Sequence, residues 1–171
     1  MWDIHIMDGY GLELETPDGW NANVNEGAQN PEPGHTLLPR TDQECVTFTF
    51  TNPEETLVLT LHPTCGFMEA ASSSCSQNGV IVKQWGGQYF ILRWFDEQSL
   101  TYRYSEANMN TVSDRLGTHK EMQCANPPVL AFDGGKGLTF IEIELQYLGA
   151  DSEREAALQQ ADHIVASIRK H

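Results

Sequence analysis

Apolar and polar residues alternate through much of the chain, and this pattern predicts an antiparallel β-sheet. Residues 10–15 (Tyr-Gly-Leu-Glu-Leu-Glu) show the period of two that is typical of a strand with one buried face. A tight turn is expected at residues 16–19, because Pro17 restricts φ and Gly19 tolerates a positive φ. Further strands are expected at residues 45–51, 56–62, 80–84, 88–95, 100–104 and 138–147.

The connections between these strands complete the expected topology. Residues 52–55 (Asn-Pro-Glu-Glu) predict a hairpin loop, and the strands within 80–104 predict a meander. The strand at 88–95 is apolar on both sides, so we expect a central position with both faces covered. Residues 21–44 predict a long irregular loop, and residues 105–117 fit either a loop or a short helix.

One helix is expected, at residues 151–170. Ala157, Ala161, Ile164, Val165 and Ile168 recur at helical spacing and would form one apolar stripe. Ser152 with Glu155 matches a capping box, and Arg169 with Lys170 would lie at the negative end of the helix dipole. The chain therefore predicts a single α+β domain over residues 1–171: an antiparallel β-sheet with a C-terminal helix packed on one face, as a layered sandwich.

Composition narrows the possible partners. Ten Lys and Arg residues against 24 Asp and Glu residues give a formal net charge of -14, which disfavours nucleic acid. The sequence holds no run of eighteen apolar residues, so no membrane-spanning segment is predicted. The first residues do not resemble a secretory signal; if the protein is exported, we expect that a signal or anchor has been removed.

Cys45, Cys65, Cys75 and Cys124 form an even set beside turn residues, which is typical of disulfides in exported domains. The prediction is Cys65 paired with Cys75 across a short loop, leaving Cys45 with Cys124. Cys45 with Cys65 is the alternative, because a hairpin centred near Pro53 brings residue 45 close to residue 62. Four reduced thiols in a cytosolic protein are the other interpretation.

Both ends of the chain resemble the PsbP-like fold family. The resemblance rests on Tyr10-Gly11-Leu12-Glu13-Leu14 followed by Thr16-Pro17-Asp18-Gly19-Trp20, and on the final segment from Ala161 to Ile168. It covers about a quarter of the chain. It implies a sheet covered by helices or loops and a non-catalytic accessory role, and it carries no catalytic residue over to this sequence.

Three groups of residues are candidates for chemical sites. Ser72-Ser73-Ser74 lacks the Gly-x-Ser-x-Gly motif of a hydrolase and is interpreted as a loop. Glu142 with Glu144, like Glu13 with Glu15, is interpreted as the wet face of a strand rather than an acid–base pair. A metal site would draw on the set His62, Cys65, Cys75, His5, His35 and His119, which follows no known ligand spacing.

Two further segments carry candidate chemistry. Residues 133–137 (Asp-Gly-Gly-Lys-Gly) lack the phosphate-loop spacing and predict a hairpin turn. Aromatic residues gather in the central meander, where core packing is the default and a surface ligand platform is the alternative; they are Trp85, Tyr89, Trp94, Tyr102 and Tyr104.

The sequence thus favours a non-enzymatic, extracytoplasmic binding or accessory domain, with a bacterial origin expected. Its partner would be another protein or a cell-surface component. We assign no catalytic, cofactor-binding or metal residue. The alternatives are a metal-binding protein that uses His and carboxylate ligands, and a small hydrolase without a visible motif.

Overall fold

A computed structural model describes residues 1–7, 9–26, 46–63, 71–75, 78–85, 88–126, 128–135 and 138–171. Over these residues the chain is a sheet-dominated α+β protein, as the alternating pattern predicts. The first sheet has the strand order β1-β2-β13. Its members are β1 (Trp2–Met7), β2 (Leu12–Pro17) and β13 (Arg169–Lys170).

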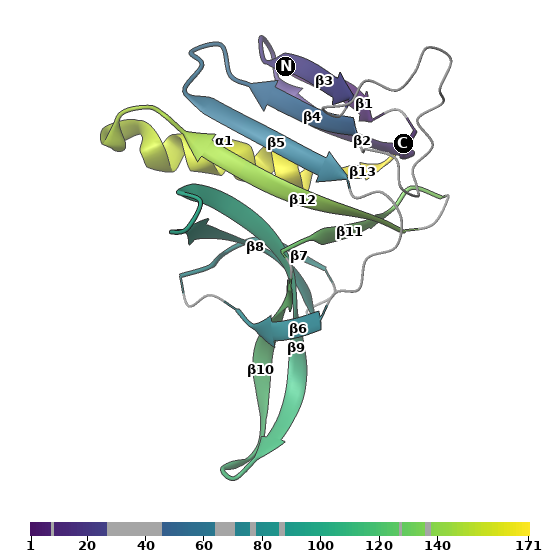
Figure 1. Ribbon diagram of the computed structural model, residues 1–171, viewed down its shortest axis with the longest axis vertical. Coiled ribbons are helices and arrows are strands. Elements are labelled where there is room, and N and C mark those ends of the chain that lie inside the picture. Colours follow the sequence, from purple (N-terminus) through teal and green to yellow (C-terminus); the bar gives the residue numbers. More distant parts are fainter. Residues whose placement is uncertain are drawn as a thin grey trace.

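The larger sheet contains ten strands among the described residues, and Figure 1 shows helix α1 lying across it. Its longest path runs β3-β4-β5-β12-β9-β10-β6, with β7, β8 and β11 paired beside that path. The strands are β3 (Asn21–Glu26), β4 (Val46–Thr51), β5 (Leu57–Pro63), β6 (Ala71–Ser74), β7 (Val80–Trp85), β8 (Tyr89–Asp96), β9 (Thr101–Asp114), β10 (Gly117–Asn126), β11 (Leu130–Asp133) and β12 (Leu138–Tyr147).

Strand β12 agrees with its predicted range and joins the parts of the large sheet. One edge pairs with β5 through residues 141–147, and the other pairs with β11 and then with β9. Ile141, Ile143 and Leu145 are buried, while Glu142 and Glu144 face the wetter side. The strict alternation of apolar and polar residues in β12 therefore places one face on the core and leaves the other face polar.

The predicted hairpin at residues 52–55 is confirmed. Asn52 is buried, and its side-chain oxygen accepts hydrogen bonds of 2.8 Å from the backbone N–H groups of Thr56 and Leu57. Glu55 takes a left-handed conformation with φ 58°. The Asn52 side chain thus satisfies the backbone donors that the tight turn leaves open.

Strand β8 is covered on both faces at residues 90–93, as its double-sided apolar pattern predicts. Ile91 belongs to the main core, whereas Phe90 and Leu92 belong to a second, smaller cluster on the opposite face. That cluster also contains Ala107 and Cys124. Strand β8 lies between β7 and β9, so both of its edges are paired, and the two clusters bury its two faces.

The predicted helix is shorter than its apolar period suggests. A 3₁₀ turn, η1 (Asp151–Glu153), precedes α1 (Arg154–Ala166), and Arg169 and Lys170 form β13 instead of the last helical turn. The capping box is also wrong, because no side chain caps the start of α1. Ser167 ends the helix: its hydroxyl donates to the Ile164 carbonyl and accepts from the Glu15 N–H.

The predicted apolar stripe of the helix lies on the sheet. Ala161, Ile164, Val165 and Ile168 are buried in the main core, and Ala157 is half-buried against it. The helix contacts β2, β7 and β12. The apolar side of α1 therefore packs against strands of both sheets, as expected of an amphipathic helix.

Two sequence-based expectations about loops are corrected. Residues 21–26, assigned to a long irregular loop, form strand β3 on the edge beside β4; residues 27–44 of that loop lie outside the described residues. Residues 105–117, expected as a loop or short helix, are mostly the second half of β9. That half pairs with β10 to form a two-stranded arm that projects from the rest of the molecule (Figure 1).

Candidate functional site

Four side chains line up across four adjacent strands on one face of the large sheet. Trp85 of β7 pairs with Tyr89 of β8, Tyr89 pairs with Asn108 of β9, and Asn108 pairs with Gln123 of β10. Directly opposed residues in an antiparallel sheet point to the same face. We call Trp85, Tyr89, Asn108 and Gln123 the strand row.

The aromatic half of the strand row is open to solvent. The exposed fraction is 38% for Trp85 and 50% for Tyr89, both unusually high for large rings in a sheet. The Lys83 ammonium lies 5.0 Å from the centre of the Trp85 ring and also donates a 2.8 Å hydrogen bond to the Ala166 carbonyl at the end of α1. Lys83 therefore anchors the indole edge of the row to the helix.

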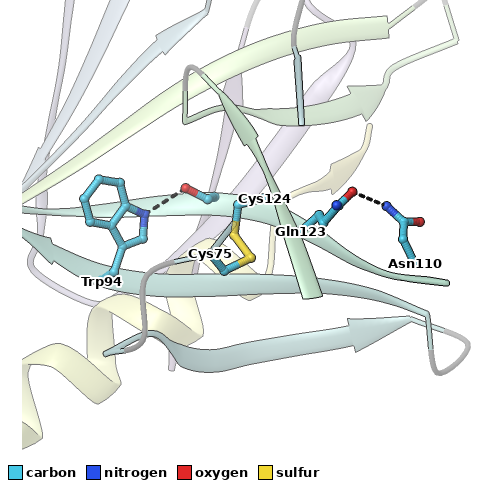
Figure 2. The surroundings of a disulfide bond; sticks show 6 residues. Cys75, Trp94, Asn110, Gln123 and Cys124 are labelled. Atoms are coloured by element: carbon cyan, nitrogen blue, oxygen red, sulfur yellow. Dashed lines mark hydrogen bonds between the residues drawn. A yellow bond between two sulfur atoms is a disulfide. The ribbon is translucent and has the colours of Figure 1, made fainter. Parts of the chain in front are cut away.

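The amide half of the row carries hydrogen-bonding capacity. Asn110, two residues further along β9 on the same face, donates a 2.7 Å hydrogen bond to the Gln123 side-chain oxygen (Figure 2). The side-chain oxygen of Asn108 is buried without a hydrogen-bond partner. Native proteins leave few buried polar atoms unpaired, so this oxygen marks a position where a polar ligand group would be stabilising.

A carboxyl group borders the strand row on the side of the main core. Glu106 lies on β9 opposite Ile91, on the same face as Asn108. Burial raises the pKa of Glu106, while a hydrogen bond from the Ala131 backbone acts in the opposite direction. The carboxyl group accepts a proton more readily than a solvated glutamate does, which reduces negative charge beside the row in mildly acidic solution.

The back of the strand row is packed and covalently fastened. Phe90, Leu92, Ala107 and Cys124 lie in the smaller core cluster on the reverse face. A disulfide joins Cys75, just after β6, to Cys124 of β10, with a Cα–Cα distance of 4.9 Å (Figure 2). The apolar cluster therefore backs β8, β9 and β10, and the disulfide ties β10 to the end of β6, which favours a preformed surface.

This disulfide overturns the predicted pairing of Cys65 with Cys75 and of Cys45 with Cys124. Strand β6 pairs antiparallel with β10, and Ser73 lies opposite Cys124, so Cys75 is brought beside Cys124. Sheet register, rather than the shortest loop, decides the pairing. Cys45 and Cys65 lie outside the described residues.

An open cavity of about 450 Å³ lies between α1, β2 and β7, where Val82 is the β7 residue that lines it. Its lining includes charged groups that already have partners: Asp162 accepts from Arg93 at 2.8 Å, and Arg169 lies 3.0 Å from Glu15. Asp162 also accepts a 2.8 Å hydrogen bond from the Tyr104 hydroxyl. These paired ions stabilise the helix against the sheet and leave less charge for a ligand.

The metal-site alternative drew on six residues, and two of its described members already have other partners. Cys75 is bound in the disulfide and cannot supply a thiolate, and His62 hydrogen-bonds to Thr47 over 3.3 Å. Within the described part of the chain, no group of three or more His, Cys, Asp or Glu side chains could hold a metal ion. Cys65 and His35 lie outside that part.

Three of the four carboxylate candidates form ion pairs with arginine side chains. Glu144 lies 2.9 Å from Arg103, and Glu13 and Glu15 both contact Arg169. Residues 72–74 belong to strand β6, not to a loop, which corrects that expectation. Strand β11 ends at Asp133, and Gly134 and Gly135 lead from it toward β12, its antiparallel partner, as expected of a hairpin; residues 136–137 lie outside the described range.

The aromatic candidates divide between core and surface. Tyr104 is fully buried, and burial raises its pKa well above the ordinary value, with the charge of Asp162 acting in the same direction. Trp94 donates a 2.8 Å hydrogen bond to Ser105 (Figure 2). Trp85 and Tyr89 fit the platform alternative. The sequence reasoning missed Asn108 and Gln123, because only the register of four strands brings them beside the aromatics.

Comparison of the chain with protein-family models, with curated proteins and with solved structures finds no match. Evidence for the function therefore comes from the geometry and chemistry of the strand row. Among the described residues, no helix has the length and apolar content needed to cross a membrane.

Proposed function

We propose that this protein is a non-enzymatic binding or accessory domain that works outside the cytoplasm and contacts its partner through the strand row. The observation that carries the proposal is the exposure of Trp85 and Tyr89 in register with the amides of Asn108 and Gln123. Exposed aromatics flanked by convergent polar groups are typical of recognition surfaces. The rigid backing of the row supports binding without a large ordering cost.

The disulfide supports the proposed location. Disulfides persist in oxidising compartments and are rare in the cytosol, and Cys75–Cys124 fastens strands whose sequence separation is 49 residues. The layered arrangement and the accessory role that the PsbP-like resemblance implies are part of the same proposal. A bacterial cell envelope is the proposed setting.

A binding assay on whole surfaces tests this function. Fluorescently labelled protein is incubated with washed bacterial cells and isolated envelope material, and bound protein is measured over a concentration series. We expect saturable binding that is lost in a Trp85→Ala/Tyr89→Ala double variant. Phe95→Ala is the matched control, because Phe95 lies on β8 with an exposed fraction of 40% but outside the strand row. Absent binding, or equal binding by the double variant and the wild type, contradicts the proposal.

A further inference from the structure

The strand row also indicates the chemical class of its ligand. We propose that the row binds a neutral carbohydrate chain, with its sugar rings stacked on Trp85 and Tyr89 and its hydroxyl groups bonded to Asn108 and Gln123. This inference rests on the proposed function and specifies the partner of the same site.

The order of side chains in the row suits a polyol. Two exposed aromatic rings provide apolar faces for the C–H surfaces of sugar rings. Each primary amide offers both a donor group and an acceptor oxygen, which complements adjacent hydroxyl groups that also donate and accept. Neighbouring strands are about 4.8 Å apart, so the four-strand row is roughly 14 Å long, a length that accommodates a short oligosaccharide.

The buried oxygen of Asn108 strengthens this assignment. It is an acceptor without a partner in the middle of the row, between Tyr89 and Gln123. Because this oxygen is buried, a ligand hydroxyl would donate to it only after the amide turns toward the open face. An apolar ligand would instead leave the row's amides buried and unpaired, which is costly.

The net charge disfavours anionic ligands, and Lys83 disfavours a cation beside Trp85. The net charge of -14 repels nucleic acids, acidic polysaccharides and anionic lipid surfaces. A cationic ligand would meet Lys83, whose ammonium already lies over the Trp85 ring and is held by the Ala166 carbonyl. A second cation close to Lys83 would be repelled by it. A neutral ligand that combines hydroxyl groups with C–H faces avoids both conflicts.

The experiment measures binding of the purified whole chain to a panel of glycans. Insoluble cellulose, β-1,3-glucan, mannan and starch are the neutral probes, alginate is the acidic probe, and free protein is quantified after sedimentation. We expect saturable binding to at least one neutral glycan and none to alginate. Trp85→Ala and Asn108→Leu should each weaken that binding on the order of tenfold, as loss of a central contact does.

Controls separate a loss of binding from a loss of folding. Phe95→Ala should bind like the wild type, and the circular dichroism spectrum and the melting temperature of each variant should show a folded domain. Tyr89→Phe keeps the ring and should retain most of the affinity, whereas Tyr89→Ala should lose it. Binding that is unchanged by Trp85→Ala, Tyr89→Ala and Asn108→Leu would overturn the inference.

The two assays distinguish a failure of the carbohydrate inference from a failure of the proposed binding function. If no neutral glycan binds and soluble oligosaccharides fail to compete, yet envelope binding still requires Trp85 and Tyr89, the row binds another class of partner, such as a peptide. The carbohydrate inference is then wrong and the binding function stands. If envelope binding is also absent, both are wrong.

Discussion

Arg93 of β8 and Asp162 of α1 form an ion pair of 2.8 Å in which both side chains are largely buried, with exposed fractions of 6% and 16%. Burial lowers the pKa of Arg93, but the hydrogen bond and the charge of Asp162 outweigh burial, so the pKa is raised. The guanidinium therefore remains charged beneath the helix. This pair connects the only described α-helix to the central strands.

Removing Asp162 should strongly destabilise the protein. Asp162→Ala leaves the Arg93 charge buried without its partner, which typically costs about 3 to 5 kcal/mol of unfolding free energy. Urea denaturation followed by circular dichroism measures the change. Arg169→Ala is the control, because Arg169 is 41% exposed and solvent screens its pairs with Glu13 and Glu15, so its removal should cost far less than that of Asp162. Equal costs for the two variants would contradict this account.

Truncation of Ile164 tests the contact between helix and sheet. The side chain is fully buried in the main core, so Ile164→Ala should lower the unfolding free energy by about 2 to 5 kcal/mol. Gln160→Ala, on the exposed side of the same helix, should change it by less than about 0.5 kcal/mol. A small effect of Ile164→Ala in chemical denaturation would mean that α1 is peripheral.

Non-reducing peptide mapping tests the disulfide, and a peptide that contains both Cys75 and Cys124 is expected. If all four cysteines are paired, Cys45 must then join Cys65, the alternative that the hairpin around Pro53 suggested. Replacing Cys75 and Cys124 by serine should cost about 4 kcal/mol in the chain-entropy treatment, given their separation of 49 residues. Detection of a Cys65–Cys75 peptide, or of four alkylatable thiols, would contradict the structure.

His5 should make stability depend on pH in a predictable direction. Burial lowers the pKa of His5 below 6.5, and Asp3 opposes this effect. The neutral ring packs on Phe50 and its Nε2 hydrogen-bonds to Thr16 over 2.7 Å. The stability that His5 contributes is present above pH 6.5 and is lost as the pH falls through the lowered pKa, because the unfolded state then binds more protons.

The check compares His5→Gln with the wild type by urea denaturation from pH 7.5 to pH 5. The variant should lose less stability across this range. Glu106→Gln provides the opposite case, since a raised carboxyl pKa contributes stability at low pH that is lost as the pH rises through it. Its stability relative to the wild type should therefore be greatest at pH 7.5 and decrease toward pH 5. Parallel pH curves for all three proteins would contradict both assignments.

The sequence predicts a strand well when one face of the strand packs on the core and the other faces solvent. Strand β12 has an apolar core face and a polar face, so its alternation fixed both ends of the strand. The arm of β9 and β10 gave no such signal, because residues 113–120 are exposed on both faces. Strand β3 was missed for the same reason: residues 21–24 are exposed at a sheet edge. The end of the helix was not predicted because it depends on a hydrogen bond from the Glu15 N–H of β2 to the Ser167 hydroxyl, a contact between segments distant in the sequence.

The candidate site was predicted only in part. Composition alone drew attention to Trp85 and Tyr89 as aromatics in a meander. Asn108 lay in a segment assigned to a loop or short helix, and Gln123 was not placed in a strand. Their alignment depends on three successive strand registers, and local sequence carries little information about pairing between strands.

The central position of strand β12 determines how the large sheet unfolds. It pairs with β5 on one edge and with β11 and β9 on the other, so the β3–β4–β5 side and the β7–β10 side of the large sheet share this one strand. Neither side can unfold completely while β12 keeps all its partners. Hydrogen–deuterium exchange should therefore be slowest at the amides of Ile143 and Leu145, with rates that report global unfolding, while amides at the tip of the arm exchange through local fraying.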